Sequence, residues 1–196
     1  MKQLIAAVVS LAVLAGPMTA RAAEVFGGVY AHGLQPKQPE GGVDGLLGVR
    51  TGRLESLGFL FKPSVHALVA ANTEVDTAFV AVGLNWPIPI GMGGRLYLRP
   101  GLGLALTNGE TDIGNAFDPG LTAAERARRL RLSSTRIDFG SALLFEPEIG
   151  LGYRFSDRIS AEVSYLHLSN GEIFHQGKNQ GLDDLGVRVN YRFGAR

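Results

Sequence analysis

The stretch RLYLRPGLGLAL, residues 95–106, decides the fold, because its residues alternate in polarity without a break. Leucine or proline stands at every even position, and charged, small or tyrosine residues stand at every odd position. Successive side chains of a β-strand point to opposite faces, so a period of two predicts a strand with one apolar face. The segments at residues 143–155 and 185–193 repeat this pattern.

Weaker alternation predicts five further strands, at residues 24–33, 43–53, 58–71, 75–86 and 158–169. Eight is the strand number of the smallest ordinary outer-membrane barrel, whose interior is just wide enough to be filled by side chains. The sequence therefore predicts an all-β protein, an eight-stranded antiparallel transmembrane β-barrel without a transport pore.

The composition favours a membrane barrel over an ordinary soluble domain. Hydrophobic residues make up 45% of the 196 residues and charged residues only 19%, against about 25% charged residues in soluble domains. No apolar stretch beyond the N-terminus reaches the ~18 uncharged residues of a transmembrane helix, and a closed barrel is the other structure that satisfies its backbone in lipid. The 19 basic and 18 acidic residues indicate no nucleic-acid partner, and the absence of cysteine excludes disulfides and thiolate metal sites.

The first 22 residues predict a cleaved signal peptide, so that the barrel would comprise residues 23–196. Lys2 precedes an apolar run at residues 4–15, and the segment ends in a small-residue site at residues 20–22. With the N-terminus inside, the long polar loop at about 108–138 and the connection at 170–182 lie on the outer side of a bacterial outer membrane. Residues 121–132 within the long loop predict a helix that Thr122 caps.

Two features of the predicted strands need an explanation. Pro63, Pro100 and Pro147 fall inside strands, where each removes a ladder hydrogen bond; they indicate bulges or shifted boundaries. Charged residues of both signs also fall on the inner face, where they predict an ion-pair network; a Glu146–Glu148 acid–base pair is the alternative. These residues are Lys62, Arg95, Arg99, Glu146, Glu148, Arg154, Glu162, Arg188 and Arg192.

The candidate site interrupts the apolar outer face of the strand at 158–169. His167 and Ser169 continue the parity of the apolar residues before them, and on the last strand the same parity places Asp183 outward. Antiparallel neighbours bring these ends together, so a hydroxyl, an imidazole and a carboxylate can converge as in a hydrolytic triad. The alternative is that the strand has simply entered the headgroup region.

The segment at residues 165–171 (YLHLSNG), followed by residues 179–183 (NQGLD) and a final aromatic strand, resembles the lipid A 3-O-deacylases of the PagL type, which are eight-stranded outer-membrane barrels. The resemblance implies that His167 is the general base, Ser169 the nucleophile and Asp183 the acid. The family pattern is H-x-S-N followed by N-x-G-x-E, so the acid here is Asp instead of Glu; Glu172 and Asp184 are the other candidates for it.

Several residues around this site have candidate roles. Asn170 and the backbone of Gly171 are candidate oxyanion donors, although an Asx-turn explains them equally well. Arg126, Arg128 and Arg129 on the predicted loop helix could contact lipid A phosphates, or the helix could be merely solvated. His32, His66 and His175 have no metal-ligand spacing and are expected to be structural or surface residues. The expected enzyme needs no metal or cofactor.

The sequence thus predicts an outer-membrane serine esterase that removes an ester-linked acyl chain, the 3-O-linked hydroxyacyl chain of lipid A. Lipopolysaccharide is the expected substrate, and the family resemblance makes a homodimer an option. A non-catalytic barrel, an adhesin or a structural protein in which the 108–138 loop carries the function, is the rival. An acyltransferase is a third possibility, because water and a second lipid compete for the same acyl-enzyme.

Overall fold

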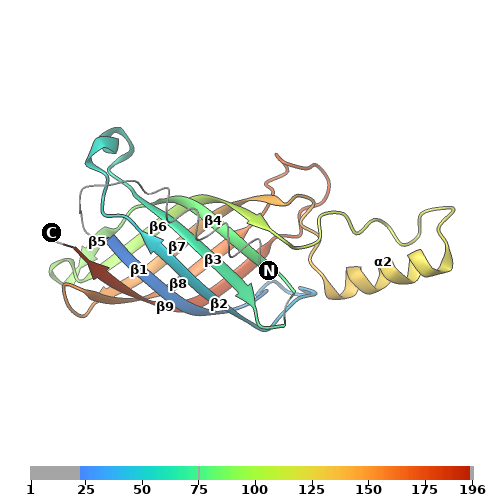
Figure 1. Ribbon diagram of the computed structural model, residues 1–196, viewed down its shortest axis with the longest axis horizontal. Helices are drawn as coiled ribbons and strands as arrows, with labels where there is room; N and C mark the ends of the chain where they lie inside the picture. Colours follow the sequence, from blue (N-terminus) through green and yellow to red (C-terminus); the bar gives the residue numbers. More distant parts are fainter. Residues whose placement is uncertain (1–22, 75, 195–196) are drawn as a thin grey trace.

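The computed structural model describes residues 23–74 and 76–194, which form a closed antiparallel β-barrel (Figure 1). The expected signal peptide at residues 1–22 lies outside the described residues. Eight long strands build the wall: β1 (Ala23–Ala31), β2 (Val43–Arg50), β3 (Ser64–Asn72), β4 (Ala78–Asn85), β6 (Leu96–Thr107), β7 (Leu143–Arg154), β8 (Ile159–Leu168) and β9 (Leu182–Phe193). Each pairs with its neighbours in the chain, β1 pairs with β9, and β4 pairs with β6 to complete the ring. The predicted fold class is confirmed.

The connections distinguish the two ends of the barrel. We call the end with residues 32–42, 73–77, 108–142 and 169–181 the loop end, and the end with residues 51–63, 86–95 and 155–158 the turn end. The helix α2 (Ala123–Thr135) belongs to the longest connection and projects beyond the loop end (Figure 1). Its N-cap is Thr122, whose hydroxyl accepts a hydrogen bond from Glu125 N–H, as the sequence predicted.

The largest difference from the predicted strand boundaries is at the start of β3. Residues Glu55–Leu60 form a 3-10 helix, η1, so β3 begins at Ser64, and Pro63 precedes the strand instead of interrupting it. The short strand β5 (Ile88–Gly91) and the 3-10 turn η2 (Met92–Gly94) were not predicted. Pro100 and Pro147 do lie inside β6 and β7.

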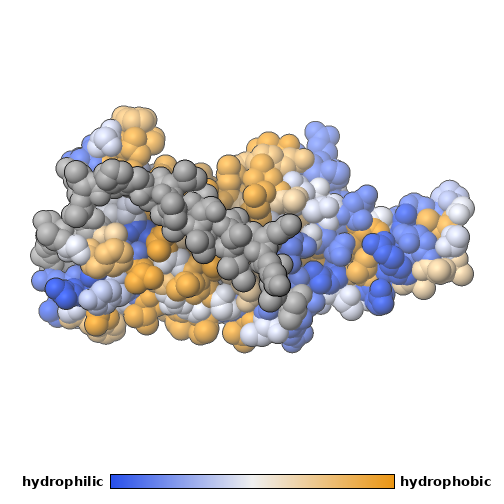
Figure 2. All heavy atoms as spheres, viewed as in Figure 1, coloured by the Kyte–Doolittle hydropathy of each residue, from blue (hydrophilic) through white to orange (hydrophobic). Residues whose placement is uncertain are grey.

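Alternation along the strands divides the barrel into an apolar wall and a polar interior. Outward residues such as Leu102, Val163 and Val187 are about half exposed, whereas their inward neighbours are buried. Figure 2 shows the apolar residues spread over the barrel wall and hydrophilic residues gathered over the loops and α2. This belt matches the lipid-facing surface of an outer-membrane barrel. No helix within the described ranges is long and apolar enough to cross a membrane.

Ion pairs fill the interior, as the alternation predicted. Arg188 Nε and Nη1 contact Glu162 at 2.5 Å and Glu148 at 2.7 Å, and Arg99 Nε contacts Glu162 at 2.9 Å. Glu148 therefore serves the network instead of an acid–base pair, while Glu146 contacts the buried His66 at 3.2 Å. The network also contains Glu24 and Arg50, which the sequence analysis missed.

Two of the residues expected on the inner face lie elsewhere. Lys62 is exposed in the connection before β3 and pairs with Glu55 at 2.6 Å, and Arg95 is exposed just before β6 begins. Both were misplaced because alternation was extended past the true strand ends. Small residues make room for the large interior side chains: a Cβ on Gly152 would collide with the Tyr97 ring, so this inward position of β7 requires glycine.

Candidate active site

The outward row of β8 ends in a polar group near the loop end. Tyr165, His167 and Ser169 follow one another at every second position, so they share the face that carries Ile159 and Val163 lower on the strand. Ser169 lies just beyond β8, where its N–H and C=O pair with Phe145 of β7. The apolar row therefore stops at the rim of the belt, as the parity argument predicted.

The register of β8 and β9 places His167 directly opposite Asp183. The imidazole Nδ1 lies 2.5 Å from Asp183 Oδ1, and both side chains are partly accessible, with 29% and 15% of their surfaces exposed. Nδ1–H donation to the carboxylate fixes the tautomer in which Nε2 carries the lone pair. The structure thus brings together two of the three candidate triad residues.

Asp184, an alternative acid, lies on the opposite face of β9. It is 2% exposed, accepts a hydrogen bond from Gly33 N–H at 3.3 Å and lies 3.6 Å from His32 Nδ1, inside the barrel. Glu172 is exposed in the β8–β9 connection, where its N–H donates to Asn170 Oδ1. Asp184 cannot reach His167, because neighbouring residues of a strand face opposite sides. Glu172 forms no ion pair or hydrogen bond with His167 among the described residues.

Ser169 shares the outward face but forms no hydrogen bond to His167. Residues two apart on a strand are separated by about 6.6 Å, a span that an imidazole ring and a hydroxyl can bridge when both turn toward each other. Among the described residues, no side-chain hydrogen bond occupies the Ser169 hydroxyl. The serine hydroxyl is therefore available for a hydrogen bond to Nε2.

The Asn170 side chain holds the loop in place. It is fully buried, its amide donates to the Phe139 and Lys178 carbonyls at 2.7 and 2.5 Å, and its Oδ1 accepts from Glu172 N–H, which forms an Asx-turn. In this conformation the amide has no hydrogen left for an oxyanion, which corrects that expectation. Gly171 N–H, in contrast, has no partner among the described residues and stays a candidate donor.

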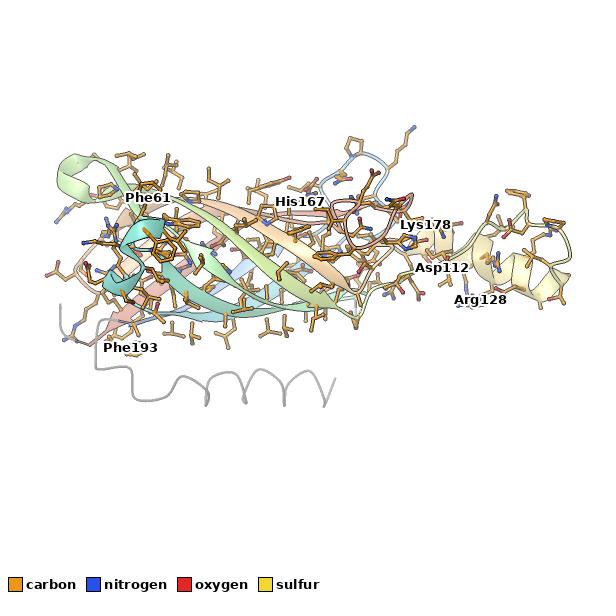
Figure 3. The ribbon with its side chains drawn as sticks, turned by 90° about the horizontal axis from the view of Figure 1, so that it is seen from above. Phe61, Asp112, Arg128, His167, Lys178 and Phe193 are labelled. Atoms are coloured by element: carbon orange, nitrogen blue, oxygen red, sulfur yellow. The ribbon has the colours of Figure 1, made fainter. Side chains whose placement is uncertain are left out.

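The arginines of α2 lie away from His167. Arg126 donates to the Ala116 carbonyl, Arg128 pairs with Glu125, and Arg129 pairs with Glu125 and with Asp118. Figure 3 shows Arg128 on the projecting helix, well beyond His167 along the barrel axis. These contacts stabilise the loop itself, so the structure does not bring the three arginines to the site.

Contacts between the loops hold the site from the loop end. Lys178 of the β8–β9 connection pairs with Asp112 at 2.9 Å and with Asp138 at 3.0 Å, and the pKa of Lys178 is raised because its hydrogen bonds to these carboxylates outweigh partial burial. Figure 3 shows Lys178 and Asp112 close together at this end. Gln180 Oε1 accepts from Asp138 N–H at 2.7 Å. The 108–142 connection thus fastens the loop that follows Ser169.

Buried His32 and its carboxylates fasten the β1–β2 connection inside the barrel. Its Nδ1 contacts Asp44 at 2.9 Å and its Nε2 contacts Glu40 at 3.3 Å. Burial disfavours the charged imidazole, but these two hydrogen bonds raise the pKa of His32 to about 10. The ligand atoms of His32, Asp44 and Asp184 lie within 4.8 Å of one another, so a cation could replace the proton there. The mutual pairing accounts for the cluster as a structural ion pair.

Tyr165 and Gln35 were missed as candidate site residues. Tyr165 O–H donates to Asp183 Oδ1 at 2.5 Å, and the Gln35 side chain lies beside this carboxylate. Parity could have indicated Tyr165, because it stands two residues before His167 on the same face. No sequence signal could have placed Gln35, because its connection reaches the site only through the β1–β9 pairing.

Fold and site together define a class: a small outer-membrane-type β-barrel with a histidine–carboxylate pair on its outward surface. The family model described as "Lipid A 3-O-deacylase (PagL)" matches residues 48–192, which include His167, Ser169 and Asp183. The chain belongs to this family.

Solved structures agree with the barrel fold. The outer membrane enzyme PagL superposes with a TM-score of 0.54 at 16% identity, covering 86% of this chain and 98% of that chain. Neisserial surface protein A (NspA) gives a TM-score of 0.52 at 10% identity, covering 88% and 97%. A de novo designed transmembrane β-barrel gives 0.51 at 12% identity, covering 90% and 98%. At these identities the similarity concerns the fold alone. The comparison with curated proteins found no match.

Proposed function

We propose that the protein is a serine esterase of the bacterial outer membrane that releases the 3-O-linked hydroxyacyl chain of lipid A. The observation that carries the proposal is the His167–Asp183 pair on the outward surface, with Ser169 two residues further on the same face. A substrate anchored in the outer leaflet presents its ester at headgroup depth, where the apolar row of β8 ends. The family membership supports the same substrate class.

In the proposed reaction, Ser169 Oγ attacks the ester carbonyl carbon while His167 Nε2 takes the hydroxyl proton. Asp183 stabilises the imidazolium that forms, and the tetrahedral intermediate collapses when His167 returns the proton to the departing sugar oxygen. Water then attacks the acyl-enzyme with His167 again as the base, which releases the fatty acid and restores Ser169. Hydrogen bonds of this kind often tighten only when substrate is bound, which is consistent with the unpaired serine.

The developing oxyanion needs donors, and one well-placed donor contributes about 3 kcal/mol to transition-state stabilisation. Gly171 N–H is our candidate, since it lies two residues from the nucleophile with no partner in the described structure. Its φ of +62° turns the chain at this point, a conformation that glycine adopts at no steric cost. Asn170 then contributes by holding this turn.

The experiment is mass spectrometry of lipid A from cells that carry the protein. The wild-type chain should remove one hydroxyacyl mass, Ser169→Ala should remove none, and Ser133→Ala, an exposed hydroxyl on α2, should behave as wild type. Unchanged lipid A with a correctly folded wild-type barrel would contradict the proposal and favour the non-catalytic barrel. Transfer of the acyl chain to a second lipid would indicate an acyltransferase instead.

A further inference from the structure

The Asp183 carboxylate receives more hydrogen bonds than a triad requires. His167 Nδ1 and Tyr165 O–H both reach the same oxygen, Asp183 Oδ1, each at 2.5 Å. The Gln35 side chain lies beside the same carboxylate. The proposed reaction uses only the contact with His167, so the other two side chains have no role in it.

The two additional side chains come from different elements of the barrel. Tyr165 is paired with Leu185 across the β8–β9 ladder, so its ring reaches Asp183 along the diagonal, a span within the range of aromatic side chains. Gln35 comes from the β1–β2 connection, on the far side of β9. The carboxylate is therefore held between two elements that are remote in sequence.

The connection that carries Gln35 is itself fixed against β9. Leu34 N–H donates to the Asp183 carbonyl at 2.9 Å, and Gln38 Nε2 donates to the Gly181 carbonyl at 2.9 Å. Inside the barrel, Gly33 N–H donates to Asp184. These three hydrogen bonds fasten the connection that carries Gln35 against β9.

We infer that Tyr165 and Gln35 are positioning residues that hold the Asp183 carboxylate in the orientation that His167 requires. This inference rests on the proposed function for its kinetic consequences. An aspartate near the membrane surface can rotate toward water, and these two side chains restrict it to the orientation that meets Nδ1.

The test compares Tyr165→Phe with Tyr153→Phe, which removes the same hydroxyl from an outward position of β7 near the turn end. Tyr165→Phe should lower kcat about 10-fold with little change in KM, as for the loss of one charge-assisted hydrogen bond. Tyr153→Phe should change neither value.

A second measurement does not depend on activity. In detergent micelles the proton resonance of His167 Nδ1–H should move upfield in Tyr165→Phe and in Gln35→Ala, because a carboxylate that is free to turn toward water accepts this proton less strongly. Gln35 lies outside the strands, so its variant tests the inference even if Tyr165→Phe fails to fold. Unmoved resonances in folded variants would overturn the inference. If the wild-type chain had no deacylase activity, only the proposed function would be contradicted. The resonance test would still decide whether Tyr165 and Gln35 position Asp183.

Discussion

Replacing Asp183 by Asn tests the assignment of the acid most directly. The change keeps the shape of the side chain but removes the charge that faces His167 Nδ1 at 2.5 Å. It leaves Ser169 and the apolar wall untouched. Any loss of rate therefore measures how much the Asp183 carboxylate helps His167 to act as the base.

The expected magnitude follows from the charge that develops on His167 in the transition state. Two unit charges about 4 Å apart attract by about 4 kcal/mol at an effective dielectric constant of about 20 and by about 1 kcal/mol in bulk water. The side chains are 29% and 15% exposed, which places the pair nearer the first value. A loss of about 3 kcal/mol corresponds to a fall in kcat of about 160-fold. The fall would be larger if the new amide turned its NH₂ toward Nδ1 and imposed the wrong tautomer.

The assay is release of hydroxy fatty acid from purified lipopolysaccharide in detergent, with folding checked by the gel mobility of the unheated barrel. Asp183→Glu restores the family's acid and should retain more activity than Asp183→Asn. Glu172→Gln and Asp184→Asn remove the other two candidate acids and should keep wild-type kcat. If Asp183→Asn stayed within twofold of wild type while Ser169→Ala was inactive, the assigned acid would be wrong.

Three further predictions concern the barrel, each measured by urea unfolding in lipid vesicles. Arg188→Met leaves Glu148 and Glu162 buried without their shared cation and should lower the free energy of unfolding by about 3–5 kcal/mol; a loss below about 1 kcal/mol would contradict the interior network. Val187→Arg puts a charge on the lipid-facing wall and should cost about 2–4 kcal/mol, and no cost would argue against that belt. His32 has its pKa raised to about 10 in the folded chain, despite burial, by its carboxylate partners; its contribution is complete below about pH 6.5 and is lost as the pH rises through 10. The stability difference between wild type and His32→Gln should therefore shrink over that range, and a constant difference would refute the pairing.

The site residues were predicted from their odd or even positions along the strands. This argument is reliable wherever a strand is continuous. It placed His167, Ser169 and Asp183 on one face because side chains alternate with a fixed period of two. It failed where a strand had already ended: Lys62 and Arg95 were assigned inward because nothing in the local pattern marks η1 or the start of β6. Boundaries depend on pairing with neighbouring strands, which a local pattern does not contain.

The choice among the three candidate acids shows that a sequence does not give distances between side chains on different strands. Parity favoured Asp183 over Asp184, but the distance to His167 depends on the register between β8 and β9, which is set by every pair along the ladder. The sequence left open whether Asn170 donates to the oxyanion or forms an Asx-turn. The structure decides this, because the amide donates to the Phe139 and Lys178 carbonyls. Those carbonyls belong to separate connections that only the closed barrel brings together.

The sequence by itself determined the barrel class, its apolar wall, its charged interior and the face on which the polar group of β8 lies, because all of these follow from alternation within single strands. Only the tertiary structure decided that His167 contacts Asp183, that Tyr165 and Gln35 share that carboxylate, and that the arginines of α2 lie elsewhere. These contacts join residues up to about 150 positions apart in the chain, such as Gln35 and Asp183. Closure of the barrel between β1 and β9 creates that proximity, and no local pattern encodes it.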